Sequence, residues 1–492
     1  MAKDHSADLM QALIAKLYAE ITGNDGNIHI PRNKFVTWMK PGIPFMSEDF
    51  LFCAKGLAGS SAEQAKDLQH QAWTLSKLFD YIPDVSNPFV DDSLQQHIFT
   101  STQDTISSVY RDVLKHSKVV NQELTEKEQQ KLKKFRDLMT VTKEVEDLIT
   151  EEKKTVTEPG PITVAYTQKM NDYIDAADEY MNLLIDAQSA KGSDPEAIRR
   201  VAAWANKSKF VRKKLEAAEM AWISQGYKNE YEQMNAYINQ VTQRSMVLYK
   251  EDLLRKFEAA RLTSTAEGTA GDFYYTTLLP GNFATSPGWV DFSFYDQDYE
   301  SHYNKSTSQW SAGGNVNYGL FSISASASGS KLEISQNQKS TNFRARLKFT
   351  QVPICRPWFD PGFFTMRGWK LDDMWNLNFN NKKVSDGAPT PTGRLVAYPI
   401  TALFVKDVFI KFDELASQSQ YIDSKIRGGG SVGWGPFRVG GSYSHGKERR
   451  DLQYNAEGGE IAIPGMQLIG FINNVVPMSP NTNPAIKPDQ FI

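Results

Sequence analysis

The chain contains few cysteines, no long apolar run and little excess charge of either sign. Two cysteines among 492 residues, Cys53 and Cys355, exclude a disulfide framework and favour two reduced thiols. No segment approaches the ~20 consecutive apolar residues of a membrane-spanning helix. The formal net charge of −3 gives no reason to expect a concentrated basic surface, so we expect no nucleic-acid partner. A hydrophobic content of 40% and a charged content of 23% are ordinary for a globular protein.

The sequence also lacks a convincing catalytic or metal-binding motif. It contains no HExxH, no GxSxG and no cysteine–histidine spacing typical of zinc sites. Residues 441–447 match the start of a phosphate-binding loop, but Glu448 stands where that loop requires Ser or Thr. The acidic residues between positions 291 and 300 lack the glycine turn of an EF-hand, which favours a solvated acidic loop. We therefore predict a non-enzymatic protein without a cofactor.

The first residues lack the continuous apolar core of a secretory signal. Apolar residues instead recur on one side of a predicted amphipathic helix, at Leu9, Leu13, Ile14 and Leu17. We therefore expect synthesis as a soluble cytoplasmic protein without a standard signal peptide. Later release from the cell and association with a membrane both stay open.

Composition divides the chain into three regions and predicts the α+β class. Residues 1–100 indicate a small, mixed and mainly helical N-terminal region. Residues 101–263 are rich in Glu, Lys, Gln, Ala and Leu, which predicts an elongated antiparallel helical bundle or coiled-coil hairpin. Residues 264–492 gain Gly, Ser, Asn and aromatic residues in alternating patterns. This pattern predicts an antiparallel β-sandwich-like domain.

Within the helical region, apolar residues spaced three and four apart predict a first helix from about Asp104 to Glu158, which Pro159 would end. A second helix follows. A third is predicted from about Pro195 to Arg261, with a weak point at Gly226.

A Gly/Ser-rich strand pattern occurs twice in the third region. Residues 313–331 and 429–447 align without a gap and share eight identical positions. These positions are Gly313/Gly429, Gly314/Gly430, Val316/Val432, Gly319/Gly435, Phe321/Phe437, Ser326/Ser442, Ser328/Ser444 and Lys331/Lys447. We infer an internally duplicated β-unit, with repeat units at about 308–356 and 424–473. The apolar alternation slips by one residue at Phe321 and at Pro436-Phe437, which predicts a β-bulge in each copy.

The first copy and its return strand together predict an amphipathic β-hairpin. Candidate membrane or subunit contacts lie on its apolar side: Phe321, Ile323, Ala325, Phe343, Leu347 and Phe349. Candidate lumen-facing or polar positions lie on its other side: Ser324, Ser326, Arg344, Arg346 and Lys348. This alternation is typical of a membrane barrel strand.

A dense aromatic cluster follows the return strand, with Trp358, Phe359, Phe363 and Trp369. If exposed, these residues form a candidate contact for a glycan, a lipid headgroup or a protein. Their large apolar area favours a position in the core.

The leading hypothesis is a non-enzymatic, oligomerising and pore-forming, toxin-like protein, with other copies of this chain and a lipid membrane as its partners. A soluble sandwich also buries one face of each strand, so alternation does not separate the two cases. The alternative is therefore a soluble structural or ligand- or partner-binding β-sandwich with a helical assembly arm.

Overall fold

The computed structural model describes residues 6–22, 33–59, 61–85, 96–98, 101–121, 124–146, 153–189, 195–264, 271–295, 298, 322–324, 343–380, 382–388, 391–411, 426, 431–440, 442–445, 448–451, 455–457 and 460–492. Its helices and antiparallel sheets confirm the α+β class. The chain forms two compact units. Unit 1 comprises Met1–Val119 and Leu253–Ile492, and unit 2 comprises Val120–Asp252. Residues 1–100, predicted as a region of their own, thus share a unit with the C-terminal β-region.

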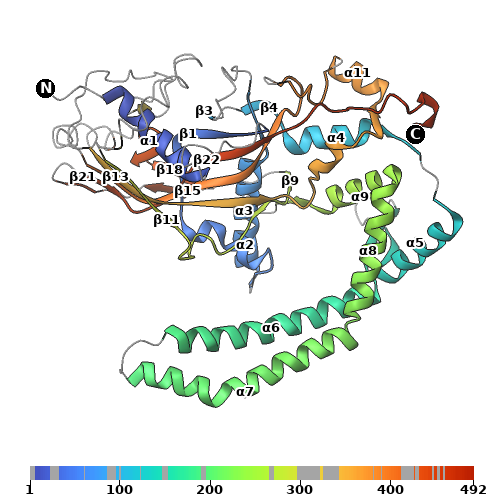
Figure 1. The fold of residues 1–492 in the computed structure, drawn as a ribbon, viewed down its shortest axis with the longest axis horizontal. Helices are drawn as coiled ribbons and strands as arrows, with labels where there is room; N and C mark the ends of the chain where they lie inside the picture. Colours follow the sequence, from blue (N-terminus) through green and yellow to red (C-terminus); the bar gives the residue numbers. More distant parts are fainter. Residues whose placement is uncertain are drawn as a thin grey trace. The chain divides into compact units, whose positions relative to one another are not determined.

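Unit 1 is built on one large sheet (Figure 1). Its main path has the strand order β10-β13-β15-β22-β1-β3, while β11 pairs with β13, β21 with β15 and β20 with β21. The β1–β3 pair is parallel and the other pairs are antiparallel. The strand bounds are β1 Lys34–Phe45, β3 Gln96–Ile98, β10 Thr277–Leu278, β11 Val290–Tyr295, β13 Arg344–Cys355, β15 Ala397–Lys411, β20 Asn455–Glu457, β21 Glu460–Ile463 and β22 Met466–Val475.

Strict alternation of apolar and polar residues explains the position of β13 in this sheet. Ala345, Leu347 and Phe349 are buried, whereas Arg344 and Arg346 are exposed. Successive side chains of a strand point to opposite faces, so one face of β13 is apolar and the other is cationic. A strand is therefore confirmed at the predicted position, and it continues to Cys355.

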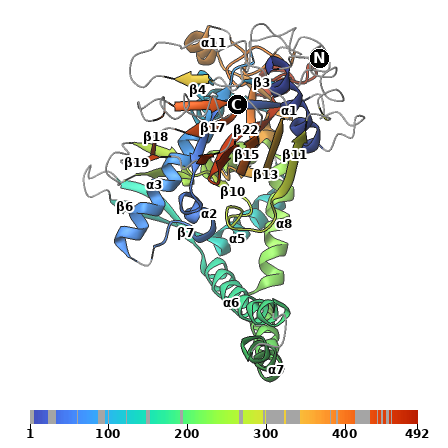
Figure 2. The ribbon, with the colours of Figure 1, turned by 90° about the vertical axis from the view of Figure 1, so that its left-hand side faces the viewer.

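Helix α1 (Ser6–Ile21) packs on the apolar face of the sheet (Figures 1 and 2). Leu13, Ile14 and Leu17 have no exposed surface, which agrees with the predicted amphipathic pattern. The strand residues buried in the same core include Trp38, Phe292, Phe294, Leu347, Leu403, Val405 and Ile410.

A second core covers the other face of the sheet, at the opposite end of β13 and β15. It contains Val352 and Phe404 from these strands and Phe79 from α3 (Ala62–Phe79). The hydroxyl of Ser61 accepts a hydrogen bond from the Gln64 N–H at 3.2 Å and caps α3. The short helices η1 (Ser47–Phe50) and α2 (Leu51–Lys55) complete this core.

A small sheet in unit 1 has the order β12-β16-β17. Its strands are β12 (Ser322–Ser324), β16 (Ser431–Trp434) and β17 (Phe437–Gly440). The predicted bulge at Pro436-Phe437 is wrong, because Trp434 pairs with Phe437 and the chain reverses at Gly435-Pro436. Gly435 has a φ of +56°, and a glycine with positive φ at the first central position suits a two-residue hairpin turn. The register shift lies earlier, between Val432 and Gly433.

Shorter elements complete unit 1. They are β2 (Tyr81–Pro83), β4 (Ser101–Thr105), α4 (Ile106–His116), β5 (Ser117–Val119), β8 (Arg261–Thr263), β9 (Asp272–Tyr274), η2 (Pro361–Thr365), β14 (Trp369–Leu371), α11 (Asp373–Phe379), β18 (Ser442–His445), β19 (Glu448–Asp451) and η3 (Pro488–Gln490).

Unit 2 is mainly helical. It contains α5 (Glu126–Met139), the antiparallel hairpin of β6 (Thr140–Glu146) and β7 (Lys153–Pro159), α6 (Pro161–Ser189), α7 (Pro195–Ser224) and α8 (Lys228–Arg244). Helix α9 (Met246–Ala259) begins in this unit. The long helices α6 and α7 run side by side (Figure 1), and the chain breaks near Gly226 as predicted.

The single helix predicted from Asp104 to Glu158 is wrong. The chain forms α4, β5 and α5 there, followed by the β6–β7 hairpin. Thr140, Val141 and Thr142 on β6 and Thr155, Val156 and Thr157 on β7 are β-branched residues, which favour strands. The apolar residues that suggested a helix in this part therefore also fit the alternation of a strand.

Candidate functional site

The clearest candidate site is one end of a four-stranded antiparallel part of the large sheet, which we call the meander: β11, β13, β15 and β21. Tyr295 pairs with Arg344, Arg344 with Lys411, and Lys411 with Glu460. These four residues form one rung across the sheet. The chain leaves the meander after Tyr295 and after Lys411, and it returns at Arg344 and at Glu460. Both excursions therefore start and finish at the same end of the sheet.

The two excursions have equal lengths and equivalent contents. Residues 296–343 and residues 412–459 each comprise 48 residues. The first repeat copy begins at Gly313 and the second at Gly429, so each copy starts 17 residues after the start of its excursion. The two copies inferred from the sequence thus lie in two equally long segments that start and finish on the same rung of the sheet.

The described parts of the two copies meet in the small sheet. Ser322 of the first copy pairs with Gly433 of the second on one side, and Arg438 pairs with Gly433 on the other. Ser322 and Arg438 occupy aligned positions of the repeat. Strand β16 is therefore flanked by equivalent residues of both copies. The sequence predicted instead that the strand containing Ser322 would pair with β13, but β13 pairs with β10, β11 and β15.

The predicted contact residues on β13 and just before it lie in the core of unit 1. Phe343 is 1% exposed, Leu347 3% and Phe349 5%. The Phe343 ring lies 5.4 Å from the Trp434 ring of β16, centroid to centroid. In this conformation α1 and the small sheet cover these side chains. Ile323 and Ser324 belong to β12, while Phe321, Ala325 and Ser326 lie outside the described residues.

The opposite face of the meander is basic. Arg344 and Arg346 are exposed and Lys348 is half-buried, as predicted for its polar side. Lys406 and Lys411 of β15 lie directly opposite Lys348 and Arg344. Like charges in directly opposed pairs are unfavourable, so two cationic cross-strand pairs on one face are a notable feature of this sheet.

Neighbouring groups offset part of this repulsion. Lys411 forms an ion pair with Glu460 at 2.5 Å, and Asp291 pairs across the sheet with Lys348. The Lys406 ammonium lies 4.3 Å from the centroid of the Trp289 ring, and the Arg346 guanidinium 4.6 Å from that of Phe409. Lys406 and Lys411 were not predicted, because strict alternation would place residues five positions apart on opposite faces, and a register shift of β15 between them changes this.

The aromatic cluster is part of the core. Trp358, Phe359, Phe363 and Trp369 are 1%, 8%, 0% and 0% exposed. Trp358 and Phe359 pack around Tyr110 of α4, and Phe363 lies against Trp369 with 4.6 Å between ring centroids. These four residues lie in the core, as their large apolar area predicted. In this conformation they offer no surface to a glycan or lipid.

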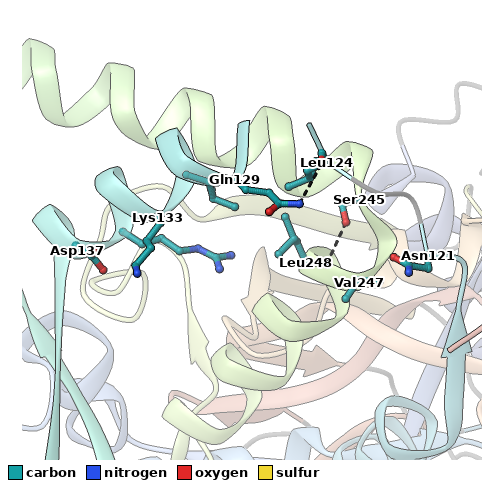
Figure 3. Close-up of a pocket in the computed structure, with 10 residues that line it drawn as sticks. Asn121, Leu124, Gln129, Lys133, Asp137, Ser245, Val247 and Leu248 are labelled. Carbon is teal, nitrogen blue, oxygen red and sulfur yellow. Dashed lines mark hydrogen bonds between the residues drawn. The ribbon is translucent and has the colours of Figure 1, made fainter. Parts of the chain in front are cut away.

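A pocket in unit 2 is lined by residues of α5 and of the segment before it, and by Ser245 and the start of α9 (Figure 3). Its volume is about 390 Å³. Gln129 donates a hydrogen bond to the Leu124 carbonyl, and the Leu248 N–H donates to the Ser245 hydroxyl. Lys133 and Asp137 line the same pocket. This lining combines charged and apolar groups, but it does not pair a nucleophile with a base.

A second, larger pocket of about 870 Å³ in unit 2 is lined mainly by aromatic and aliphatic residues of α5, α6 and α8, including Phe135, Met234 and Tyr237. The Lys131 ammonium lies 4.1 Å from the centroid of the Tyr237 ring. This pocket also lacks a group of residues that would support catalysis.

Two buried charged residues of unit 1, Asp80 and Arg356, have structural roles. The Asp80 carboxylate accepts hydrogen bonds from the N–H and the hydroxyl of Ser107 in the first turn of α4. The Arg356 guanidinium donates to the carbonyls of Phe79 and Pro399 at 2.7 and 2.6 Å. Burial raises the pKa of Asp80, while burial lowers the pKa of Arg356 to about 10. Arg356 thus joins the end of α3 to β15, and Asp80, which follows α3 directly, joins it to α4.

Among the described residues, no group of three or more His, Cys, Asp or Glu side chains is placed to hold a metal ion. In the same part of the chain, no helix combines the length and the apolar composition needed to cross a membrane. A comparison of the chain with protein families, curated proteins and solved structures gives no match.

Proposed function

We propose that this protein is a non-enzymatic, oligomerising pore former, and that its two 48-residue excursions insert into a membrane as β-hairpins. One observation carries this proposal: both excursions leave the meander at the same end, and each contains one copy of the repeat. Two extended hairpins at this end would lengthen all four strands of the meander in register. Four lengthened antiparallel strands per subunit are a suitable unit for a barrel built from several copies.

The length of the excursions is sufficient for this role. A hairpin made from 48 residues has arms of about 23 residues, or roughly 75 Å at about 3.3 Å per residue. A strand tilted in a barrel needs only ~9–11 residues to cross the hydrocarbon layer. Each hairpin would therefore span the membrane, and the remaining residues would form a stem above it.

The two faces of the meander have the polarity that such a barrel requires. Arg344, Arg346 and Lys348 would continue into the water-filled lumen, and the row of Leu347 and Phe349 would continue onto the lipid side. Because the apolar face is now buried, insertion requires α1 and the small sheet to leave it. The proposed pore former is thus stored here in a closed conformation.

A disulfide lock between the two excursions tests the proposal. Ser324 and Ser431 are direct cross-strand partners in β12 and β16, so the double variant S324C/S431C, made on a C53S/C355S background, would join the two repeat copies covalently. We expect the oxidised protein to release no dye from phosphatidylcholine vesicles, with or without phosphatidylserine and cholesterol. Reduction with dithiothreitol should restore release to the level of the background protein.

The matched control is T142C/T157C, because this pair joins direct partners in the β6–β7 hairpin of unit 2. Its oxidation should leave dye release unchanged. Equal release by the oxidised and reduced forms of S324C/S431C would refute insertion of the excursions. An absence of release by the unmodified protein from every vesicle type would refute pore formation altogether. Replacing Leu347 or Phe349 by Asp is a poorer test, since both side chains are buried and the variant would unfold.

One observation favours the alternative, a soluble partner-binding or structural module. The apolar side chains that precede and occupy β13 are already packed against α1 and the small sheet within a single chain. A protein that leaves all vesicles intact and keeps these residues buried in the presence of lipid, as measured by hydrogen exchange, would have this function instead.

A further inference from the structure

The outer edge of β11 is closed by side chains instead of by another strand. Within the described part of the chain, β11 pairs only with β13. The Lys16 ammonium donates a hydrogen bond to the Ser293 carbonyl at 2.8 Å. The Tyr295 N–H donates to the Asp298 carboxylate at 2.8 Å. Lys16 and Asp298 also form an ion pair at 3.1 Å.

This arrangement fills the hydrogen-bonding positions that an added strand would use. Ser293 and Tyr295 are two residues apart, so their backbone groups point to the same side of β11. A neighbouring strand would donate to one of these groups and accept from the other. Lys16 supplies such a donor and Asp298 such an acceptor. Proteins commonly protect exposed strand edges against pairing with charged side chains.

The closure of the β11 edge by Lys16 depends on α1, because Lys16 belongs to this helix, which also covers the apolar face of the sheet. Leu13 and Leu17 of α1 are fully buried in the core beneath it. At its C-terminal end, the Gln351 side chain of β13 donates to the Ile21 carbonyl at 2.8 Å. Departure of α1 would therefore expose the apolar face, free the Ser293 carbonyl and remove the cation that pairs with Asp298.

The far side of the same sheet offers a second, different edge. At the excursion end the strand order is β11-β13-β15-β21-β20. Strand β20 belongs to the second excursion, so extension of that excursion leaves β21 as the edge strand. An assembly that joins the β11 edge of one copy to the β21 edge of the next is heterologous, and repetition of such a contact forms a ring when the rotation between copies closes.

We propose that the outer edge of β11 is the assembly surface for a second copy of this chain, which adds its β21 edge there, and that the Lys16–Asp298 pair holds the protein monomeric until α1 departs. This inference rests on the proposed function for its occupant, because a pore needs a ring of identical copies. Pairing through main-chain groups would give the affinity, as it does when peptides add to an exposed sheet edge.

The proposal can be tested with two substitutions that open the outer edge of β11. Lys16→Met removes the donor and the charge but keeps an unbranched apolar stem, and Asp298→Asn removes the charge at nearly constant size. Their matched control is Lys143→Met, which breaks an ion pair with Glu158 at 2.6 Å in the β6–β7 hairpin. Lys16→Arg keeps the donor and the charge, so this variant should assemble at the same concentration as the unmodified chain. Mass photometry, with and without phosphatidylcholine vesicles, measures assembly, and thermal unfolding checks that each variant is folded.

We expect Lys16→Met and Asp298→Asn to assemble at about tenfold lower protein concentration, since each removes a charge-assisted bond from the closed edge. Lys143→Met should assemble as the unmodified chain does. Assembly of both edge variants at the same concentration as Lys143→Met would overturn the inference.

A cysteine pair identifies the edges that meet. Ser293→Cys places a thiol on β11 and Ala462→Cys one on β21, in a chain with Cys53 and Cys355 replaced by serine. Three strand spacings separate the two strands within one copy, about 14 Å, so a disulfide between them must join two copies. We expect it to form when the two single-cysteine proteins are mixed under assembling conditions. Assembly without this disulfide would assign the contact to another surface and overturn the inference.

The outcomes for assembly and for pore formation are separable. Dye release together with unchanged assembly of the edge variants would leave the pore proposal intact and reject the edge. Edge-dependent assembly and cross-linking without dye release would support the edge and reject the pore. Capture of a foreign strand by Lys16→Met in place of self-assembly would reject a second copy as the occupant.

Discussion

Two neighbouring residues of β13 provide a quantitative test of how the meander is oriented. Leu347 points into the core of unit 1 and is 3% exposed, whereas Arg346 points to the exposed basic face. We predict that Leu347→Ala and Arg346→Ala, one position apart, have very different effects on the free energy of unfolding. The proposed lipid-facing and lumen-facing sides of the meander both depend on this difference.

The magnitudes follow from the contacts of each side chain. Truncating a buried leucine to alanine costs about 2–5 kcal/mol, because it removes apolar burial and leaves a cavity. Leu347 shares its core with Phe292 of β11, Val405 of β15 and Leu17 of α1, so the surrounding side chains leave little freedom to collapse. Arg346 contributes mainly its contact with the Phe409 ring at 4.6 Å. At an exposed site such a contact contributes about 0.5–1 kcal/mol.

Urea unfolding followed by tryptophan fluorescence measures both values. Trp204 and Trp222 belong to unit 2, and their replacement by phenylalanine restricts the signal to unit 1. With a slope of about 3 kcal/mol per M, Leu347→Ala should lower the midpoint by about 1 M and Arg346→Ala by less than about 0.4 M. Equal shifts, or a larger shift for Arg346→Ala, would refute the assignment of the faces.

Two further predictions concern Asp80. Asp80→Ala should destabilise unit 1 by about 1–3 kcal/mol, because it leaves the buried Ser107 N–H without its acceptor; chemical unfolding of unit 1 measures this, and a loss below about 0.5 kcal/mol would contradict it. Burial raises the pKa of Asp80, so its contribution to stability is present below the ordinary aspartate pKa and is lost as pH rises through the raised value. The unmodified chain should therefore lose stability relative to Asp80→Asn across this acidic window, and unfolding curves of both proteins that stay parallel from pH 3.5 to 7 would disprove the shift.

The sequence predicted those elements whose pattern reflects burial on one side. Strict alternation defined β13, and apolar residues recurring on one side defined α1. Repeated Gly, Val and Phe positions revealed the duplication. In each case neighbours along the chain carried the signal, because the faces of strands and helices repeat with fixed periods.

The same reasoning failed where two periods fit the same residues. Residues 140–158 form a hairpin instead of a helix, because the β-branched residues of β6 and β7 favour strands over the helix that the apolar spacing suggested. At Gly435-Pro436, an alternation slip was interpreted as a bulge, yet the chain reverses there. A bulge and a tight turn both interrupt the alternation of apolar and polar residues. The alternation alone therefore did not distinguish a bulged strand from a hairpin.

The sequence by itself determined the α+β class and the apolar and cationic sides of β13, and it indicated two aligned copies of one strand pattern. Only the tertiary structure decided that both excursions leave the meander at one end, that α1 covers the apolar side, and that Lys16 and Asp298 close the edge of β11. Lys16 and Ser293 are 277 positions apart. Such contacts join residues that have no periodic relation, so the order of the sequence contains no local signal for them.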